Sequence, residues 1–125
     1  MISLTLDQLL EINALVIEAT GGSSGLRDLG RLEAAIATQT QNVFGEELYP
    51  QVIDKAAAMI RGVIADHPFV DGNKRTAMLT GLTLLGINEL HFAAQPGEVA
   101  DFAVDIATKH IDVPDIARWL ESHIS

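Results

Sequence analysis

The residues whose types could do chemistry gather in one short stretch, HPFVDGNKR, which runs from His67 to Arg75. Histidine takes up and releases protons near neutral pH, so His67 is a candidate general base for a hydroxyl group. Asp71 supplies carboxylate oxygens, and Mg²⁺ commonly binds one or two carboxylates together with phosphate oxygens. The stretch therefore predicts a base and a metal ligand four residues apart.

The same stretch has the composition of an anion site. If a helix begins within it, the backbone N–H groups from Gly72 to Arg75 lack helical partners and point at any bound anion. Gly72 permits a tight turn, Asn73 tolerates such geometry, and Lys74 with Arg75 adds two positive charges. Cations in a first helical turn oppose the helix dipole unless an anion binds there. We expect the phosphates of a ligand at this helix start.

Taken singly, each of these residues has a simpler interpretation. His67 could be an ordinary imidazole at a helix end, Asp71 a helix cap, and Lys74 and Arg75 solvated charges. Their occurrence within nine residues, at a junction between two predicted helices, favours the functional interpretation. Phe69 is the exception, and we interpret it as the apolar anchor of the loop.

Composition limits what such a site can serve. The chain has 125 residues, of which 48% are hydrophobic, and this length predicts one globular domain over residues 1–125. The formal net charge of −9 disfavours broad binding to nucleic acid, so a phosphate must be held by a local feature. The absence of cysteine excludes thiolate catalysis and fits a reducing compartment. We expect a cytoplasmic protein that contacts neither nucleic acid nor a membrane.

Apolar residues with helical spacing predict about six helices that position the stretch. The first is expected over 5–19, with Thr5 and Gln8 as a capping box, and a glycine-rich connector follows it. The others are expected from Asp28 to 37 or 38, from Val52 to just before His67, from the stretch itself to a stop at Gly86, from Pro96, and from Asp112. The fold class is therefore a compact all-α bundle.

Several finer expectations accompany this assignment. Residues predicted to lie in the helical cores are Leu29, Leu32, Ala35, Ile36, Ala77, Met78, Leu79, Leu82, Leu84, Leu85, Val99, Phe102, Ala103, Ile106, Ile116, Trp119 and Leu120. Lys55 is assigned to the polar face of its helix, and 89–94 to a brief extended segment. Arg27 and Arg31 could approach a phosphate, although solvated or capping roles are commoner. His91, His110 and His123 lack metal-ligand spacing and are assigned to packing or the surface.

The segment QTQNVFGEELYP, between the second and third helices, predicts an ordered loop or a small hairpin. Phe44 and Leu48 leave two alternatives open. They could be exposed and contact a partner, or they could pack into the core.

The stretch HPFVDGNKR resembles the signature of the Fic/Doc superfamily, His-x-Phe-x-Asp/Glu-Gly-Asn-Gly/Lys-Arg. The segments RDLGRLEAAIA, FGEELYP and KAAAMIRGVIADHPF extend the likeness to the death-on-curing (Doc) toxins over nearly the whole chain. The resemblance implies an all-α fold whose loop binds ATP and Mg²⁺ and transfers part of the nucleotide to a protein hydroxyl. FGEELYP would be the flap that positions the target.

The resemblance also implies a role for each matching residue. His67 would be the general base and Asp71 the metal ligand. Gly72 and Asn73 would contact the phosphates through backbone and side chain, and Lys74 and Arg75 would clamp them.

Two departures bear on the reaction. Most Fic enzymes have glycine in place of Lys74 and a second arginine in place of Met78, and both differences favour the Doc type. This type transfers the γ-phosphate to a serine or threonine, with elongation factor Tu as the implied target and a cognate antitoxin as partner. Fic-type adenylyl transfer and a catalytically degenerate interaction module remain as alternatives.

Overall fold

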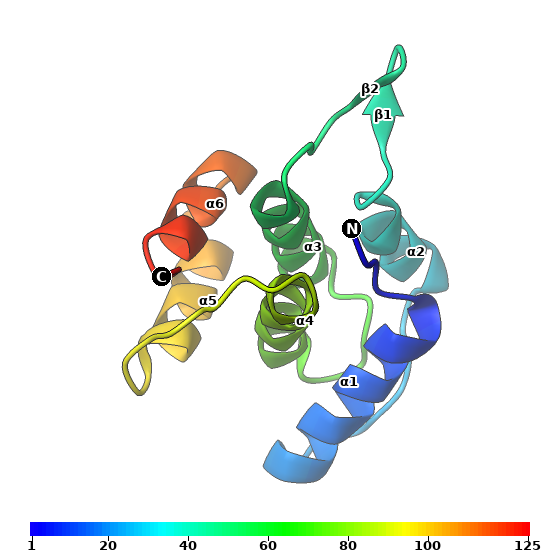
Figure 1. Cartoon of the computed structure of the whole chain (residues 1–125). Coiled ribbons are helices and arrows are strands. Elements are labelled where there is room, and N and C mark those ends of the chain that lie inside the picture. Colours follow the sequence, from blue (N-terminus) through cyan, green and yellow to red (C-terminus); the bar gives the residue numbers. More distant parts are fainter.

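The computed structural model describes residues 1–125, and they form an all-α fold of six helices with one small hairpin (Figure 1). The elements in chain order are α1 (Leu6–Thr20), α2 (Leu29–Ala37), β1 (Asn42–Val43), β2 (Glu46–Glu47), α3 (Val52–Asp66), α4 (Asn73–Ile87), α5 (Glu98–Lys109) and α6 (Val113–Glu121). The predicted fold class is confirmed.

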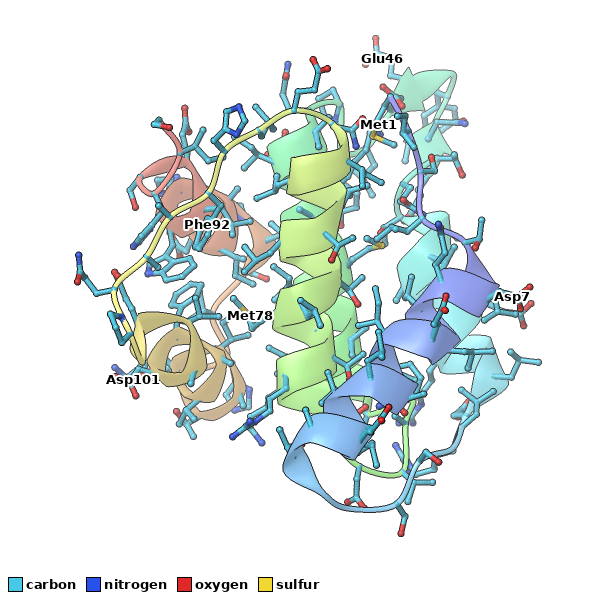
Figure 2. The ribbon with its side chains drawn as sticks, turned by 60° about the horizontal axis from the view of Figure 1, so that its bottom comes forward. Met1, Asp7, Glu46, Met78, Phe92 and Asp101 are labelled. Atoms are coloured by element: carbon cyan, nitrogen blue, oxygen red, sulfur yellow. The ribbon has the colours of Figure 1, made fainter.

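Helices α3 and α4 form the centre of the bundle. They run antiparallel, because only residues 67–72 separate them, and they pack more extensively on each other than any other pair. Figure 1 shows α1 and α2 on one side of this pair and α5 and α6 on the other. Figure 2 shows the N-terminal end of α4 beside the C-terminal end of α1. The loop with the candidate site thus lies at one end of the bundle.

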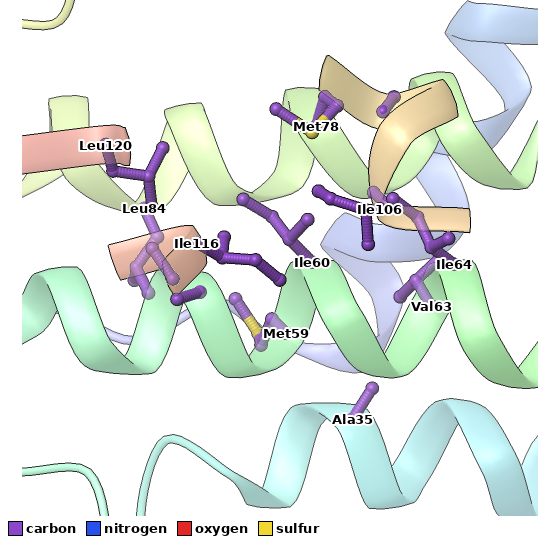
Figure 3. Close-up of a cluster of buried hydrophobic side chains, with 14 of the residues drawn as sticks. Ala35, Met59, Ile60, Val63, Ile64, Met78, Leu84, Ile106, Ile116 and Leu120 are labelled. Atoms are coloured by element: carbon purple, nitrogen blue, oxygen red, sulfur yellow. The ribbon is translucent and has the colours of Figure 1, made fainter. Parts of the chain in front are cut away.

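The core is a single cluster of buried apolar side chains between these layers (Figure 3). Ile60 from α3 and Leu84 from α4 are fully buried in it, as is Ile116 from α6. At Gly81 the two central helices approach so closely that a Cβ atom would lie 2.4 Å from Cδ1 of Ile60. This glycine is therefore required by packing rather than by a turn.

Sequence signals at the helix starts are largely confirmed. The side chain of Thr5 accepts the backbone N–H of Gln8 at 3.3 Å, and that of Gln8 accepts the N–H of Thr5 at 2.8 Å. Asp28 caps α2 by accepting the N–H of Arg31 at 3.1 Å. These short-range patterns depend only on neighbouring residues, which is why the sequence reveals them.

The predicted stop of α4 at Gly86 is wrong. The helix runs to Ile87, and Asn88 ends it, donating its side-chain amide to the carbonyl of Leu84 at 2.8 Å. The same amide group bonds the backbone of Ile2, 86 residues away. A contact distant in sequence, rather than the glycine, therefore fixes this end.

Three expectations about burial are also wrong. Leu29 is 46% exposed and Leu79 is 42% exposed, because each lies on the outward side of its helix. Lys55, expected on a polar face, is only 3% exposed. Its ammonium group donates to the carbonyl of Gln39 at 2.8 Å and to Oε1 of Glu47 at 2.9 Å, and these partners offset the cost of burying a charge.

The predicted hairpin is present as β1 and β2, and its tip is exposed. Phe44, in a left-handed conformation with φ of 52°, is fully exposed, and Leu48 is 44% exposed. The alternative in which both pack into the core is therefore wrong. The hairpin adjoins the start of α3, whereas His67 follows the other end of this 15-residue helix, which is about 22 Å long at 1.5 Å per residue. It does not cover the candidate site.

The C-terminal region packs around aromatic rings. Trp119 is half-buried against the core and stacks on Phe102 with ring centres 4.0 Å apart. The ring of His123 lies tilted against Trp119, with ring centres 4.2 Å apart. Of the segment 89–94, only Phe92 shows strand-like pairing, with Ile124. No helix combines the length and apolar character that crossing a membrane requires.

Candidate active site

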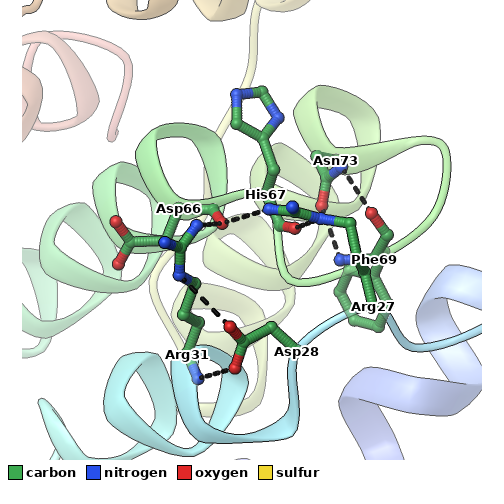
Figure 4. Close-up of polar contacts among 7 residues, drawn as sticks. All are labelled: Arg27, Asp28, Arg31, Asp66, His67, Phe69 and Asn73. Carbon is green, nitrogen blue, oxygen red and sulfur yellow. Dashed lines mark hydrogen bonds and ion pairs between the residues drawn. The ribbon is translucent and has the colours of Figure 1, made fainter.

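The loop from His67 to Gly72 carries the candidate site. His67 ends α3 in a left-handed conformation, with φ of 48°, which turns the chain sharply out of the helix. Its imidazole is exposed and points away from the two arginines that bind its backbone (Figure 4). Proton transfer requires such access for a substrate hydroxyl.

Two arginines bind the C-terminal end of α3. Arg27 donates from Nε to the carbonyl of His67 at 2.8 Å and from Nη2 to that of Asp66 at 3.0 Å. Arg31 donates from Nη1 to the Asp66 carbonyl at 2.8 Å, and Asp28 lies 3.3 Å from its Nε. Cations are favourable at this end of a helix dipole. The capping interpretation of both arginines is confirmed, and the backbone of His67 is held in place.

A buried aromatic ring and a side-chain amide fix the middle of the loop. The ring of Phe69 is 1% exposed, in the position that an apolar anchor needs. The side-chain amide of Asn73 accepts the Phe69 N–H and donates to the Phe69 carbonyl, both at 3.0 Å. Asn73 thus shapes the loop, and one amide hydrogen remains for a ligand.

The N-terminal end of α4 is open. Gly72 precedes the helix with φ of 76°, and no side chain caps it. The first helical bond runs from the N–H of Thr76 to the carbonyl of Gly72 at 2.9 Å, and the N–H groups of residues 72–75 have no partner in the chain. Lys74 and Arg75 are both exposed here. The local charge and the free donors together suit an anion.

Asp71 is positioned by residues far away in sequence. The Asn13 side chain donates to the Asp71 carbonyl at 3.0 Å and to Oγ1 of Thr76 at 3.1 Å, and Asn13 itself is buried. The N–H of Ser23 donates to Oδ2 of Asp71 at 2.8 Å. A Cβ at Gly22 would lie 3.2 Å from that oxygen, so a glycine allows the close approach.

These supporting residues are not among those that the sequence predicts. The segment from Thr20 to Gly25 was interpreted as a connector, and Asn13 was not distinguished from the rest of its helix. The two adjacent glycines were the one signal available, because paired glycines often mark a close backbone approach.

A pocket of about 530 Å³ brings the predicted residues together. Its walls are the end of α1 and the following glycines on one side and the loop on the other. The lining includes His67, Asp71, Gly72, Asn73, Lys74 and Arg75, and excludes only Phe69 of the predicted site residues. A base, a carboxylate, two cations and free N–H donors thus face one space.

The residues fit a magnesium ion that is shared with a ligand. Asp71 is exposed, and its Oδ1 atom accepts no hydrogen bond from the chain. No group of three histidine, cysteine, aspartate or glutamate side chains could hold a metal by itself. A single carboxylate completed by phosphate oxygens and water is the arrangement that Mg²⁺ commonly adopts.

An apolar groove of about 650 Å³ adjoins this pocket along α1, α4 and α5. Leu15 is 57% exposed and Val104 is 48% exposed in its walls. Thr20, Lys74 and Arg75 line both spaces. Anything filling the groove therefore comes close to the open helix start.

Comparison with known proteins agrees with this geometry. Residues 3–85 match the model of the Fic/DOC family. The chain is 40% identical over 104 residues to "Toxin Doc" of Mycolicibacterium smegmatis, covering 82% of this chain and 80% of that protein. It is 32% identical over 114 residues to "Protein kinase doc" of Escherichia phage P1, covering 91% of this chain and 89% of the other. The chain belongs to the Fic/Doc family.

Proposed function

We propose that this protein is a toxin of a toxin–antitoxin module that transfers the γ-phosphate of ATP to a serine or threonine hydroxyl of a translation protein. Similarity to proteins named as a Doc toxin and a Doc protein kinase supports a transferase toxin. The observation that carries the proposal is the open start of α4, whose free N–H groups and two cations share a pocket with His67. An elongation factor Tu-like protein is the proposed target, and cell arrest the result.

In the proposed reaction, the acceptor oxygen forms a bond to the γ-phosphorus while the bond to the bridging oxygen of ADP breaks. The electron pair of that bond leaves with ADP, and the hydroxyl proton passes to the imidazole of His67 and then to solvent. The N–H groups of residues 72–75, with Lys74 and Arg75, hold the phosphate charge. Positioning and charge neutralisation account for most of the rate in such transfers.

Magnesium would be held by Asp71 together with the phosphates of ATP, and when bound it neutralises their charge. Ser23 and Asn13 keep the Asp71 side chain and backbone in place for this role.

Lys74 favours phosphoryl over adenylyl transfer. A lysine in place of glycine occupies space beside the phosphates and provides a charge suited to a terminal phosphate, since that group carries more negative charge than the inner ones. Its side chain is exposed at the pocket wall. If the orientation of the nucleotide were the opposite, the α-phosphate would lie at His67 and the adenylyl group would be transferred instead.

A cognate antitoxin is the proposed partner, and the apolar groove is the surface that suits it. Exposed apolar side chains from α1, α4 and α5 match the apolar face of a protein segment. Because Lys74 and Arg75 line groove and pocket alike, a segment bound in the groove would restrict entry of the nucleotide.

The deciding experiment compares ATP labelled at the α- or the γ-phosphate. Purified antitoxin-free protein is incubated with elongation factor Tu and Mg²⁺, and label on protein is counted. Label from the γ-position alone is expected, and label from the α-position would establish adenylyl transfer instead. No label from either, with no shift of the amide signals of residues 72–75 on adding magnesium-ATP, would favour the inert module.

A further inference from the structure

A small apolar pocket adjoins His67 on the side of α5, and the phosphate chemistry does not use it. It has a volume of about 170 Å³, and its apolar lining comes from Ile64 and Ala65 of α3 and from Ile106, Ala107 and Ile111 of α5 and its end. Arg61, His67 and His110 complete the lining at the rim. Ile64 and Ile106 are buried and form its apolar floor. A cavity of about 150 Å³ is large enough to hold benzene, so this one accommodates a branched aliphatic or phenyl side chain.

The pocket of about 530 Å³ at the start of α4, where the phosphates are proposed to bind, is the phosphate pocket. His67 connects it to the small apolar pocket, because His67 lines both. Its imidazole must lie beside the acceptor hydroxyl to take the proton. Whatever fills the apolar pocket therefore lies next to the acceptor, on the side away from the phosphates.

We infer that the apolar pocket beside His67 receives an aliphatic or aromatic side chain of the target protein next to the acceptor serine or threonine, and so determines which hydroxyls react. This inference rests on the proposed phosphoryl transfer. With the γ-phosphate at His67, the ribose and base are separated from the acceptor by two further phosphates, so the nucleotide does not reach this space. A neighbouring residue of the target does.

Charge supports an apolar occupant rather than an acidic one. Arg61, at the rim, has its Nε atom 3.2 Å from Oδ1 of Asp112. This exposed ion pair partly offsets the one permanent positive charge in the lining. Burial of apolar area, rather than attraction of an anion, is then the main source of selectivity.

The test uses wild-type protein, magnesium, γ-labelled ATP and short serine peptides that carry leucine, phenylalanine, glycine or aspartate within three positions of the acceptor. We expect kcat/KM for a leucine or phenylalanine peptide to exceed that for the glycine peptide by about 10- to 200-fold at one position, the range that a small apolar pocket achieves. Peptides with aspartate there should react no better than those with glycine.

Ala107→Phe, which fills the pocket, should bring the leucine and glycine peptides to the same kcat/KM by lowering that of the leucine peptide. Thr108→Phe is the matched control, because Thr108 is exposed on the same helix and outside the pocket. Ala65→Phe, at an exposed position on the rim, repeats the test if Ala107→Phe does not fold.

Two failures are distinguishable. Transfer of label to all peptides without preference for an apolar neighbour would overturn the pocket assignment and leave the kinase proposal intact. Transfer from the α-position, or to no peptide and no protein, would overturn the proposed function and this inference with it.

Discussion

The two helix ends joined by the loop from His67 to Gly72 differ in how their backbone groups are hydrogen-bonded. At the end of α3, Arg27 and Arg31 donate three hydrogen bonds to backbone carbonyls. At the start of α4, six residues later, no side chain caps the free N–H groups, and two cations stand where acids would be favourable. The first end is hydrogen-bonded within the chain, whereas the second leaves its N–H donors free for the proposed ligand.

The start of α1 sharpens this contrast. There Thr5 and Gln8 form a reciprocal capping box, so the fold does use side-chain caps at a helix start. A missing cap costs about 1 kcal/mol, and a cation in the first turn about 0.3–1 kcal/mol more. Helix α4 tolerates this cost because one face of it, including Ala77 and Leu84, is fully buried in the core. An open start on a central helix is therefore available for binding.

The largest expected effect comes from removing His67, the proposed general base, which lies between the two helix ends. His67→Asn should lower γ-phosphate transfer by about 10²- to 10⁴-fold, the usual contribution of a general base. Asparagine tolerates the left-handed conformation of this position, so the free energy of unfolding should change little. Transfer is measured with labelled ATP and stability with urea. Retained turnover in a folded variant would remove His67 from its role.

Lys74→Glu should change function and stability in opposite directions. A carboxylate at the start of α4 is favourable with the helix dipole, so the free energy of unfolding should rise by about 0.3–1 kcal/mol. Phosphate binding should weaken, and we expect transfer to fall at least tenfold. Urea unfolding and the labelled-ATP assay measure the two effects on one preparation.

Lys109→Glu is the matched control for this charge change. Lys109 lies in the last turn of α5, where a cation is favourable, and it lines neither the phosphate pocket nor the groove. This variant should lose a few tenths of a kcal/mol and keep full transfer. A loss of transfer in both variants would point to net charge rather than to the helix start.

Arg27→Ala tests the C-terminal end of α3, whose carbonyl groups are hydrogen-bonded by arginine side chains. Its guanidinium group is exposed, so the loss of two hydrogen bonds should cost about 1 kcal/mol in the free energy of unfolding rather than the full value of buried charged bonds. Arg31→Ala, which removes one such bond, should cost less. Transfer should also fall with Arg27→Ala, since the His67 backbone loses a partner. Equal stability of all three proteins would show that the α3 carbonyls need no cap.

The sequence reveals the elements whose signals are local. Helical periodicity, the caps at Thr5 and Asp28, and the compact stretch from His67 to Arg75 all depend on neighbouring residues, and the structure brings that stretch into one pocket. What could not be predicted depends on residues distant in sequence. Asn13 reaches Asp71 across 58 positions, and no pattern in a single sequence encodes such a pair.

The same reason explains the errors in burial and helix length. Lys55 looks like an ordinary surface lysine until Glu47 and the Gln39 carbonyl are placed beside it. The end of α4 depends on the contact of Asn88 with Ile2. Both outcomes are decided by tertiary contacts, which outweigh local preference in each case.

A third helix start, that of α5, offers the smallest test of the contrast. Glu98 accepts the N–H of Gln95 at 2.9 Å and binds Nε2 of His123 at 2.5 Å. A carboxylate at this start is favourable with the dipole, unlike the cations of α4. The pKa of His123 is raised above its ordinary 6.5, mainly by the hydrogen bond to the Trp119 carbonyl and next by that to Glu98. The pKa of Glu98 is lowered below its ordinary 4.5, mainly by the hydrogen bond to His123 and next by that to the Gln95 N–H.

The stabilisation by this pair should therefore depend on pH. Because the pKa of His123 is raised, its contribution to the free energy of unfolding is fully present below about pH 6.5 and is lost as pH rises through the raised value. Because the pKa of Glu98 is lowered, its contribution is lost as pH falls through the lowered value.

His123→Gln should thus lower stability most between about pH 4.5 and 6.5 and least in alkaline solution. Urea unfolding across this range measures the difference, with His91→Gln, an exposed histidine that forms no ion pair, as control. A difference that did not vary with pH would mean that His123 contributes only by packing against the rings of Phe92 and Trp119. Ring packing rather than charge would then stabilise the start of α5, and the start of α4 would be contrasted with the side-chain caps of α1 and α2.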